Sequence, residues 1–553
     1  MKRTFFPLVL AVTTGVAFFL PQSALAAPSL SMPGEDIRQA APRPKASVDR
    51  TGEDAPRTTG DTVFAVREII LDAKELKLSE KKIQAIMQDA IGDEMTLASL
   101  NEVLDRLTIY CRQNGYPATA AYLPEQESEA GVITIRIIPG RYGDVKIDNK
   151  SRLKDNIAQG FLAGLDPGKI IRTRDLETAL YSISDMSGTR AVGMLRPGES
   201  FGTSDVVVQI EDGKMDNTVL YTENYGSKNS GRYRYGLQHS LYNVDGQGGK
   251  VNIGHLRSNE NLRNSYVNYE TLVGRGGTTL GLGYSRMDYH LGGAVRSLGA
   301  TGKADTYTLY GSTPVYHTSN EKLTVTYGYD HRKLKDDLQL FGDDAAGKKH
   351  SDSAHVGVNG FTRNPHTGSA VDYALSLTVG ELSSDSRYSE QLMKNAGTNG
   401  HYTKLEASAT AVVPLGHKTD MVVKVSGQIA DKNLDGSEEM YLGGANGVRA
   451  YPQGEGSGDE GIQGSIEFRY HTDVPGLLLS TYFDIGHVKF SHDGKSYGNG
   501  NGDTLKGWGI GLYYNMPGDW FARLDYARRI GLGRSVVDYD DSGRFWFLMG
   551  KIW

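Results

Sequence analysis

The chain lacks disulfide-forming cysteines, an excess of either charge and any long apolar run beyond its first residues. Cys111 is the only cysteine among 553 residues, so no disulfide can form within the chain, and we expect a small buried residue on a helix. Lys and Arg total 60 against 66 Asp and Glu, which argues against a nucleic-acid-binding protein. The mean hydropathy of −0.41 excludes a bundle of membrane-spanning helices.

Signatures of catalysis and of metal binding are also missing from the sequence. The 13 histidines show no metal-ligand spacing, and no nucleotide-binding fingerprint is present. Gly-rich runs such as Gly500–Gly502 have the composition of turns rather than of phosphate cradles. No nucleophile–base set stands out. We therefore expect a protein that is not an enzyme and that needs neither a metal nor a cofactor.

The one long apolar run lies at the N-terminus and predicts export. Two basic residues precede Phe5–Leu20, and Ala24-Leu25-Ala26 has the small-x-small pattern of a cleavage site. Residues 1–26 are thus predicted to be a signal peptide, with the mature chain starting at Ala27. Residues 27–61 are rich in Pro, Gly, Ala and charge, which is typical of a linker.

A mixed pattern of helices and strands then occurs twice. In residues 62–140, apolar residues at helical spacing predict helices over Leu78–Ala90 and Thr96–Gln113, with one strand before them and two after. The same order returns in residues 141–213, at a period of about 75 residues, which predicts two tandem α+β domains. The remaining predicted elements are strands at Val63–Leu71, Thr119–Pro124, Val132–Ile138, Asp144–Asp148, Thr189–Leu195 and Ser204–Ile210, and helices at Arg152–Leu162 and Thr173–Ser184.

From residue 214 to residue 553, helical spacing disappears and apolar residues alternate with small or polar ones, as in Leu323–Asp330 and Val371–Gly380. A soluble sandwich also alternates, but its strands are usually shorter than these segments of about ten residues. Tyrosines near the segment ends and the preceding signal peptide favour a transmembrane barrel of the outer membrane. Sixteen segments predict sixteen antiparallel strands around an aqueous lumen, beginning near Thr218, Arg232, Gly249, Ser265, Thr279, Ala304, Lys322, Ser353, Val371, Tyr402, Asp420, Ile462, Leu477, Lys506, Trp520 and Gly543.

The last predicted strand ends the chain on aromatic residues. Phe545–Trp553 alternates like the other segments and finishes at Trp553 itself. A terminal aromatic on such a strand resembles the signal that the barrel-insertion machinery reads. Phe547 and Trp553 are therefore predicted to form a C-terminal barrel signal, with that machinery and outer-membrane lipid as partners.

The most distinctive stretch is Leu442–Tyr451, within a Gly-rich segment over roughly residues 431–461. A segment of this length is ordinarily a solvated loop, and a Gly-rich turn with a solvated arginine is the simpler interpretation. Long loops on a rigid scaffold nevertheless often carry function. Arg449, between Val448 and Tyr451, favours a loop that folds back and docks its arginine.

These features together resemble the two-partner secretion transporters, the TpsB family typified by the filamentous haemagglutinin and haemolysin secretion/activation proteins. The stretch from Gly115 to Gln126 is similar to the family's helix-to-strand signature. Ile138–Gly143 is similar to its step between units, and Leu195–Asp205 to a segment of its second unit. The resemblance implies two periplasmic POTRA domains, with motif positions at Gly115, Tyr116, Pro124 and Gln126.

The resemblance also implies a place for the loop. In this family the sixth surface loop folds into the lumen with a Val-Arg-Gly-Tyr tip, which here reads Val448-Arg449-Ala450-Tyr451, with Ala450 in place of glycine. Phe483-Asp484-Ile485-Gly486 is similar to a motif on strand thirteen, and alternation points Asp484 into the lumen. Asp484 is either one more polar group of the lumen or the partner of Arg449. The lumen loop lock implied by the family consists of Val448, Arg449, Tyr451, Asp484 and Gly486.

The function implied by the resemblance is secretion of a large exported partner protein, a TpsA-like exoprotein, across the outer membrane. The POTRA domains would capture the unfolded cargo from the periplasm, and the barrel, expected as a monomer, would conduct it. An outer-membrane protein assembly factor of the same superfamily is the alternative, although it would usually carry more periplasmic units. A passive porin is a further alternative, but it does not explain the two predicted periplasmic domains. The family often has a plug helix, but residues 27–61 are interrupted by proline, so only a weak plug segment is expected there.

Overall fold

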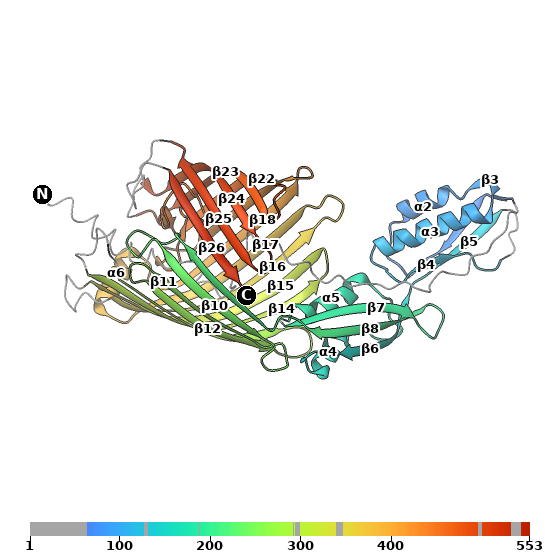
Figure 1. The fold of residues 1–553 in the computed structure, drawn as a ribbon, viewed down its shortest axis with the longest axis horizontal. Helices are drawn as coiled ribbons and strands as arrows, with labels where there is room; N and C mark the ends of the chain where they lie inside the picture. The colour runs from blue at the N-terminus through green and yellow to red at the C-terminus, as the bar shows by residue number, and fades with distance from the viewer. Residues whose placement is uncertain are drawn as a thin grey trace.

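Two small α+β units precede a closed β-barrel in the computed structural model of the chain (Figure 1). The structure describes residues 63–73, 75–126, 131–186, 188–290, 292, 299–338, 347–495, 500–531 and 543–553. The predicted signal peptide, 1–26, and the linker or plug segment, 27–61, lie outside the described residues. In the described part of the chain, no helix has the length and apolar character needed to cross a membrane.

The first unit packs two helices on a three-stranded sheet. Its strands run in the order β2-β5-β4, with β2 parallel and β4 antiparallel to β5. Thr96 caps the start of helix α3 with a capping box. Its side-chain oxygen accepts a hydrogen bond from the Ser99 backbone N–H, and its own backbone N–H donates to the Ser99 hydroxyl. The elements are β1 (Phe64–Val66), β2 (Glu68–Asp72), α2 (Glu80–Gln88), β3 (Gly92–Met95), α3 (Leu97–Gln113), β4 (Ala120–Tyr122) and β5 (Val132–Ile138).

Cys111 lies in the core of this unit, on α3, and is fully buried. Burial raises the pKa of its thiol to about 11, so the group stays neutral and packs as an apolar side chain. The lone cysteine is thus a structural residue, as its helical position predicts.

The single strand predicted over Val63–Leu71 is wrong, because the structure divides it into β1 and β2. The Gly131 carbonyl accepts the backbone N–H groups of both Arg67 and Glu68, at 2.8 and 3.3 Å, where the chain changes partner. Strand β1 then pairs with β3, and β2 with β5. Strand β3 was not predicted, since its sequence Gly-Asp-Glu-Met has no apolar alternation.

The second unit repeats this topology, with strands in the order β6-β8-β7. Helix α4 begins later than the predicted Arg152, because Ser151 forms a turn with Asn149 and its hydroxyl accepts the N–H of Leu153. The elements are β6 (Arg141–Asn149), α4 (Asp155–Leu162), α5 (Thr173–Asp185), β7 (Thr189–Pro197) and β8 (Thr203–Asp212).

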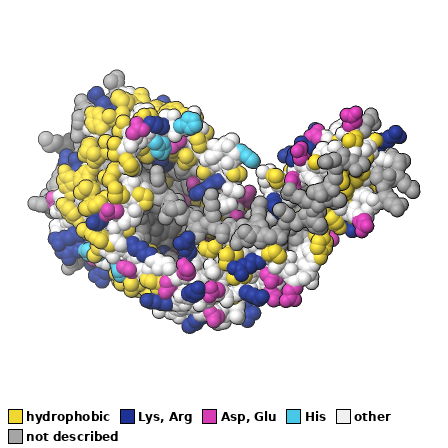
Figure 2. Space-filling view, turned by 45° about the vertical axis from the view of Figure 1, so that its right-hand side comes forward, with side chains coloured by type: hydrophobic (Ala, Val, Ile, Leu, Met, Phe, Trp, Pro, Cys, Tyr) yellow, Lys and Arg dark blue, Asp and Glu magenta, His cyan; other side chains and the backbone are white. Residues whose placement is uncertain are grey.

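Sixteen antiparallel strands close the barrel, which confirms the predicted fold class and strand number. Every strand begins within six residues of its predicted start. Apolar side chains cover the outer wall (Figure 2). No water is available in the bilayer core to hydrogen-bond a free backbone group, so only a closed sheet is stable there. The strands are β9 (Asp216–Glu223), β10 (Arg234–Tyr242), β11 (Lys250–Ser258), β12 (Arg263–Leu272), β13 (Thr279–His290), β14 (Ala300–His317), β15 (Glu321–Leu338), β16 (Gly347–Arg363), β17 (Ala370–Ser384), β18 (Gly400–Pro414), β19 (Thr419–Ala430), β22 (Glu460–His471), β23 (Leu477–Lys489), β24 (Asp503–Asn515), β25 (Trp520–Arg529) and β26 (Arg544–Ile552).

Several strands are longer than the segments of about ten residues that the sequence predicts. Strands β14 and β15 have 18 residues each, more than a bilayer core of roughly 30 Å requires. The ends of β14 and β15 away from the second unit carry polar residues such as Lys303, Lys335 and Asp337. Helix α6 (Arg387–Ala396), between β17 and β18, was also missed, although Ser386 caps its start and Gly397, with a φ of 72°, ends it.

Helix α5 of the second unit docks on the periplasmic end of β14 and β15. His317 is 1% exposed, its Nδ1 lies 2.6 Å from Asp185 Oδ2, and its ring stacks on Tyr181. Lys322 Nζ lies 2.8 Å from the same Asp185 oxygen, and the Ser319 N–H donates to Glu177. The second unit is therefore tied to the barrel mouth by charged as well as apolar contacts.

Asp185 remains ionised in this contact at neutral pH. Burial alone would raise its pKa, but the hydrogen bond from His317 and the positive charge of Lys322 outweigh burial and lower the pKa from 3.8. A lowered folded-state pKa means that the contribution of Asp185 is complete above the ordinary aspartate value and is lost as the pH falls below it.

We expect Asp185→Asn to loosen this docking while leaving both parts folded. About 1 kcal/mol of docking free energy is lost, because half-exposed ion pairs are screened by water. Hydrogen–deuterium exchange measures the change as faster exchange in α5 and in residues 317–321. Asp166→Asn, which removes a carboxylate paired with Lys169 instead of the barrel, is the control. Unchanged exchange in Asp185→Asn would exclude a role for the carboxylate in docking.

Candidate functional site in the barrel lumen

The Gly-rich segment forms a loop between β19 and β22 that folds into the lumen. Its two limbs pair through β20 (Met440–Tyr441) and β21 (Ser457–Gly458). At the tip, the Val448 N–H donates to the Leu442 carbonyl at 2.7 Å. A Cβ at Gly447 would lie 2.0 Å from that carbonyl oxygen, so only glycine permits the turn. The segment is thus a folded loop rather than a solvated one.

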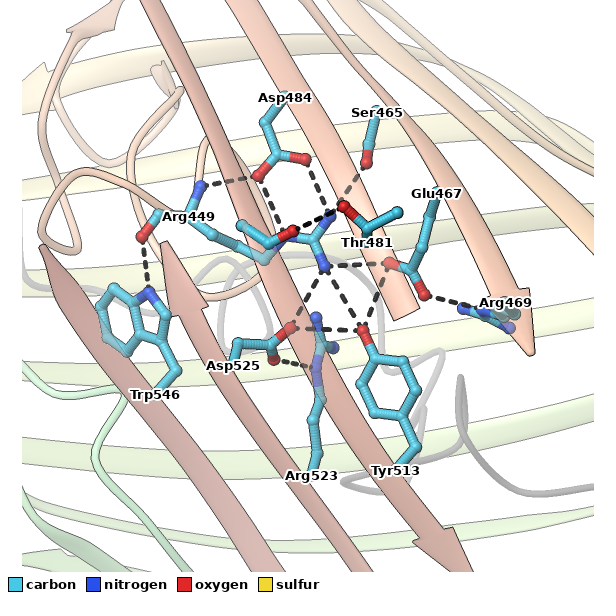
Figure 3. Close-up of polar contacts among 11 residues, drawn as sticks. Arg449, Ser465, Glu467, Arg469, Thr481, Asp484, Tyr513, Arg523, Asp525 and Trp546 are labelled. Carbon is cyan, nitrogen blue, oxygen red and sulfur yellow. Dashed lines mark hydrogen bonds and ion pairs between the residues drawn. The ribbon is translucent and has the colours of Figure 1, made fainter. Parts of the chain in front are cut away.

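Arg449 at the tip binds Asp484 on the lumen face of β23 through three hydrogen bonds (Figure 3). Its backbone N–H and its Nε both donate to Asp484 Oδ2, at 3.0 and 2.9 Å, and its Nη2 donates to Oδ1 at 2.8 Å. Arg449 is 4% exposed and Asp484 1%, whereas the flanking Phe483 is 39% exposed on the outer wall. Such a buried bidentate pair is both strong and directional.

The guanidinium also contacts neighbouring strands of the wall (Figure 3). Its Nη1 lies 2.9 Å from Glu467 on β22 and 3.4 Å from Asp525 on β25. Its Cζ lies 3.1 Å from the centre of the Tyr482 ring, as in a cation–π contact. Four strands, β22 to β25, therefore form the seat of this one side chain, which Tyr513 on β24 completes.

Charges in this seat balance. Arg469 Nε donates to Glu467 at 2.7 Å, and Arg523 Nε donates to Asp525 at 2.5 Å. Three arginines thus face three carboxylates in a buried cluster, which is how charges are tolerated away from water. Sequence reasoning missed Glu467, Arg469, Arg523 and Asp525. The signal was present, since each pair is spaced two apart at lumen-facing positions of an alternating strand.

The backbone of the tip is held as well as its side chain. Trp546 Nε1 on β26 donates to the Arg449 carbonyl at 2.7 Å, and Arg529 Nε on β25 donates to the Ala450 carbonyl at 3.3 Å. Val448 and Tyr451 are buried with Leu442 in an apolar cluster against the wall. These contacts leave the loop tip little freedom.

Two glycines of the wall make room for the tip. A Cβ at Gly486 would lie 2.8 Å from the side chain of Leu442, and a Cβ at Gly507 would lie 2.5 Å from the Cβ of Ala450. Ala450 itself is compatible with the turn, because the only described non-glycine residues with positive φ are Asn243 and Asn261. The substitution of the family's usual glycine is thus accommodated, and Gly507 supplies the space.

A second set of ion pairs, which we name the second anchor, ties the start of the loop to another section of wall. Glu438 bonds Arg332 on β15 and lies 3.2 Å from Lys404 on β18. Asp435 lies 2.6 Å from Lys349 on β16. The second anchor consists of Asp435, Glu438, Arg332, Lys349 and Lys404, none of which sequence reasoning singled out.

The predicted POTRA motif residues lie in the first unit, away from the lumen (Figure 1). The Gly115 carbonyl accepts from the Thr173 N–H of the second unit at 3.0 Å, and Tyr116 Oη accepts from the Lys77 N–H. Gln126, after Pro124, bonds both the N–H and the carbonyl of Thr134 with its side-chain amide. These hydrogen bonds stabilise the first unit and connect it to the second.

The predicted C-terminal residues close the barrel. Trp553 and Thr218 exchange backbone hydrogen bonds at 2.9 and 3.3 Å, and the Phe547 N–H donates to the Asn224 side chain at 2.8 Å. Within the described residues, no group of three or more His, Cys, Asp or Glu is placed to hold a metal ion.

A closed barrel with a docked lumen loop and two α+β units at its periplasmic mouth defines an outer-membrane barrel protein with periplasmic domains. A family model described as haemolysin secretion/activation protein ShlB/FhaC/HecB matches residues 202–514, and a POTRA domain model of ShlB type matches residues 64–140. The chain belongs to the haemolysin secretion/activation protein family, the outer-membrane transporters of two-partner secretion. The predicted family, function and location, with POTRA domains in the periplasm, are confirmed.

Individual relatives and solved structures are consistent with this family assignment. The chain is similar to the heme/hemopexin transporter protein HuxB of Haemophilus influenzae, at 26% identity over 87% of this chain and 86% of HuxB. Its fold is similar to that of CdiB from Escherichia coli, with a TM-score of 0.68 at 19% identity over 92% of this chain and 94% of CdiB. The fold is also similar to that of BamA from Haemophilus ducreyi lacking POTRA domains 1–3, with a TM-score of 0.50 at 16% identity over 89% of this chain and 100% of the BamA chain. Because the matching family model and HuxB both describe transporters, the transporter interpretation is favoured over the assembly factor.

We expect Gly507→Ala to displace the loop tip, because its new methyl group would overlap that of Ala450. Overpacking of this kind costs about 1–3 kcal/mol. Planar-bilayer recordings measure the result as a higher single-channel conductance, since the displaced loop occupies less of the lumen. Adding Ala450→Gly removes the clash and restores the original conductance. Equal conductance in Gly507→Ala and the parent protein, or failure of the rescue, would contradict this packing.

Proposed function

We propose that the chain secretes a large unfolded exoprotein of the TpsA type, and that the docked loop tip controls the lumen through which it passes. The lock consists of Val448, Arg449, Tyr451, Asp484 and Gly486. The three hydrogen bonds between Arg449 and Asp484 carry this proposal. The role is transport rather than catalysis, and a single barrel suffices as a monomer inserted by the barrel-assembly machinery through its Phe547 and Trp553 signal.

The domains that perform these steps have proposed boundaries at 62–140 for the first POTRA domain, 141–213 for the second and 214–553 for the barrel. Named relatives transport different things, since one is a heme/hemopexin transporter and another, HpmB of Proteus mirabilis, a hemolysin transporter. We therefore propose the class of cargo only.

Capture of the cargo is proposed to occur by strand addition. In the second unit β7 pairs with β8 alone, so its other edge is open to an extended chain among the described residues. Main-chain hydrogen bonds to such an edge provide affinity with little demand on sequence, as an unfolded cargo requires. The docking of α5 places this sheet beside the barrel mouth (Figure 1).

We expect Arg449→Ala to abolish or strongly reduce secretion while the barrel still folds. Truncation leaves Asp484 buried without a cation, and breaking a buried pair costs about 3–5 kcal/mol. Asp484→Ala is milder, because Glu467 and Asp525 still bind the arginine. Arg449→Lys is impaired too, since lysine lacks the planar fork. Export of the partner protein is the readout, with heat-modifiable gel mobility as the test of folding.

The double variant distinguishes a lock from two separate defects. Arg449→Ala with Asp484→Ala secretes no less than Arg449→Ala alone, because residues of one network are not additive. Normal secretion by both single variants, or defects that simply add, would refute the lock.

Deletion of residues 62–212 tests capture by the periplasmic units. We expect the shortened chain to insert, because residues from 216 onward contain all sixteen described barrel strands, but to secrete no partner. Surface labelling of the barrel serves as the insertion control. Secretion at the full rate without these units would show that they do not capture the cargo.

A further inference from the structure

Basic side chains form a band around part of the barrel's outer wall. Directly opposite residues on the six strands β11 to β16 make one row, and five of the six are Arg or Lys. The row reads Arg257, Arg263, Asp288, Lys303, Lys335 and Lys348 from strand to strand. Arg286 and Lys333 lie in the next outward-facing row, which is offset by two positions along each strand toward the bilayer centre. We name the seven cations the basic band.

The band faces outward rather than into the lumen. Inward neighbours on the same strands are buried, such as Met287 at 2% and Leu334 at 7% exposure. Residues in phase with the band are exposed, such as Tyr307 at 48% and Leu309 at 50%. Alternation therefore places the basic side chains on the surface that contacts lipid.

The band lies on the outer-leaflet side. Helix α5 and the turns of the second unit contact the opposite ends of these strands, at Gly246 and His317, which marks that end as periplasmic. In Figure 2, Lys and Arg side chains gather at the margin of the apolar wall, at the end away from the α+β units. Directly below the band, Tyr284 and Tyr307 begin the exposed apolar surface, the level at which aromatic residues meet lipid headgroups.

Carboxylates of the described residues neutralise only part of the band. Among the described residues, Arg257, Arg263, Lys333 and Lys348 form no ion pair. The other three cations pair with carboxylates at 2.5–3.5 Å, and the acids concerned are Asp288, Asp305 and Asp337. The nearby Asp352 and Asp385 each lie 2.8 Å from a histidine. These four form two pairs of like charges, Arg257 with Arg263 on β11 and β12 and Lys333 with Lys348 on β15 and β16. Although Asp288 lies opposite Arg263 and Asp305 opposite Lys333, the seven cations outnumber the three acids of the described residues that pair with the band, and an external anion can supply the remaining negative charge.

We propose that the basic band binds the phosphate groups of a phosphorylated, acylated glycolipid in the outer leaflet, of the lipid A type. Phosphate suits the chemistry, because arginine binds it through two hydrogen bonds and lysine as a point charge. The acyl chains of the same lipid pack on the exposed Leu282, Tyr307 and Leu309 below. One row of cations spanning six strands matches a lipid whose two phosphates lie at one depth in the membrane.

Lipid binding by the full-length protein tests this proposal. The detergent-purified protein is mixed with lipid A, and native mass spectrometry counts the lipid that remains bound. We expect Lys333→Gln with Lys348→Gln, and separately Arg257→Gln with Arg263→Gln, to weaken binding about tenfold or more. Lys394→Gln with Lys495→Gln removes two exposed lysines of the cell-surface loops outside the band and is the matched control, with binding unchanged.

Three comparison ligands fix the source of the phosphate. Dephosphorylated lipid A is expected to bind weakly, phosphatidylglycerol less tightly than lipid A, and inorganic phosphate not measurably. Wild-type binding by both double variants, or equal binding of dephosphorylated lipid A, would overturn the proposal. Equal binding of phosphatidylglycerol would reduce the band to general attraction for anionic lipid, and saturation by inorganic phosphate would make it a site for a free anion. Heat-modifiable mobility confirms that the variants are folded.

Discussion

The requirement that every backbone N–H and C=O be hydrogen-bonded inside a lipid bilayer governs this structure. It forces the sheet to close, so that the last strand, β26, pairs with the first, β9, through Leu548–Ile552 and Val219–Glu223. Closure around sixteen strands leaves a lumen too wide for side chains to fill. An unfilled lumen needs a separate element to occupy it, and the loop between β19 and β22 is that element.

Buried charge determines where this loop sits. An arginine away from water is stable only among carboxylates, and Arg449 finds three of them on the wall, two of which also serve Arg469 and Arg523. The same rule makes the seat specific, because the loop placed elsewhere would leave both Arg449 and Asp484 unpaired. Glycines at positions 486 and 507 then let the tip approach closely. The position of the loop is thus made specific by charge balance, and its close approach to the wall is possible because two wall residues have no side chain.

The sequence predicted the parts of the fold that depend on periodicity. Sixteen strands and four of the helices were evident, because alternation and helical spacing reflect one apolar face. Strand β3 and helix α6 were missed, since β3 lacks an apolar face and α6 was hidden in a loop between strands. For the site, family resemblance supplied Arg449 and Asp484. Glu467 and Asp525 lie on strands far apart in sequence, and the second anchor joins residues of the loop to β15, β16 and β18. Which lumen-facing charges meet depends on strand register and on the path of the loop, and neither is set by local sequence.

The lumen loop is attached at two places, since Glu438 and Asp435 hold its start to β15, β16 and β18 while Arg449 holds its tip to β22–β25. A loop held at both its start and its tip must break two sets of ion pairs to leave the lumen. Freeing the tip alone would leave a flap still tethered at its base, so we expect the passage to widen in steps, with a half-open stage between. The tether also shortens the return, because a loop held at its base finds its seat again without searching the whole lumen.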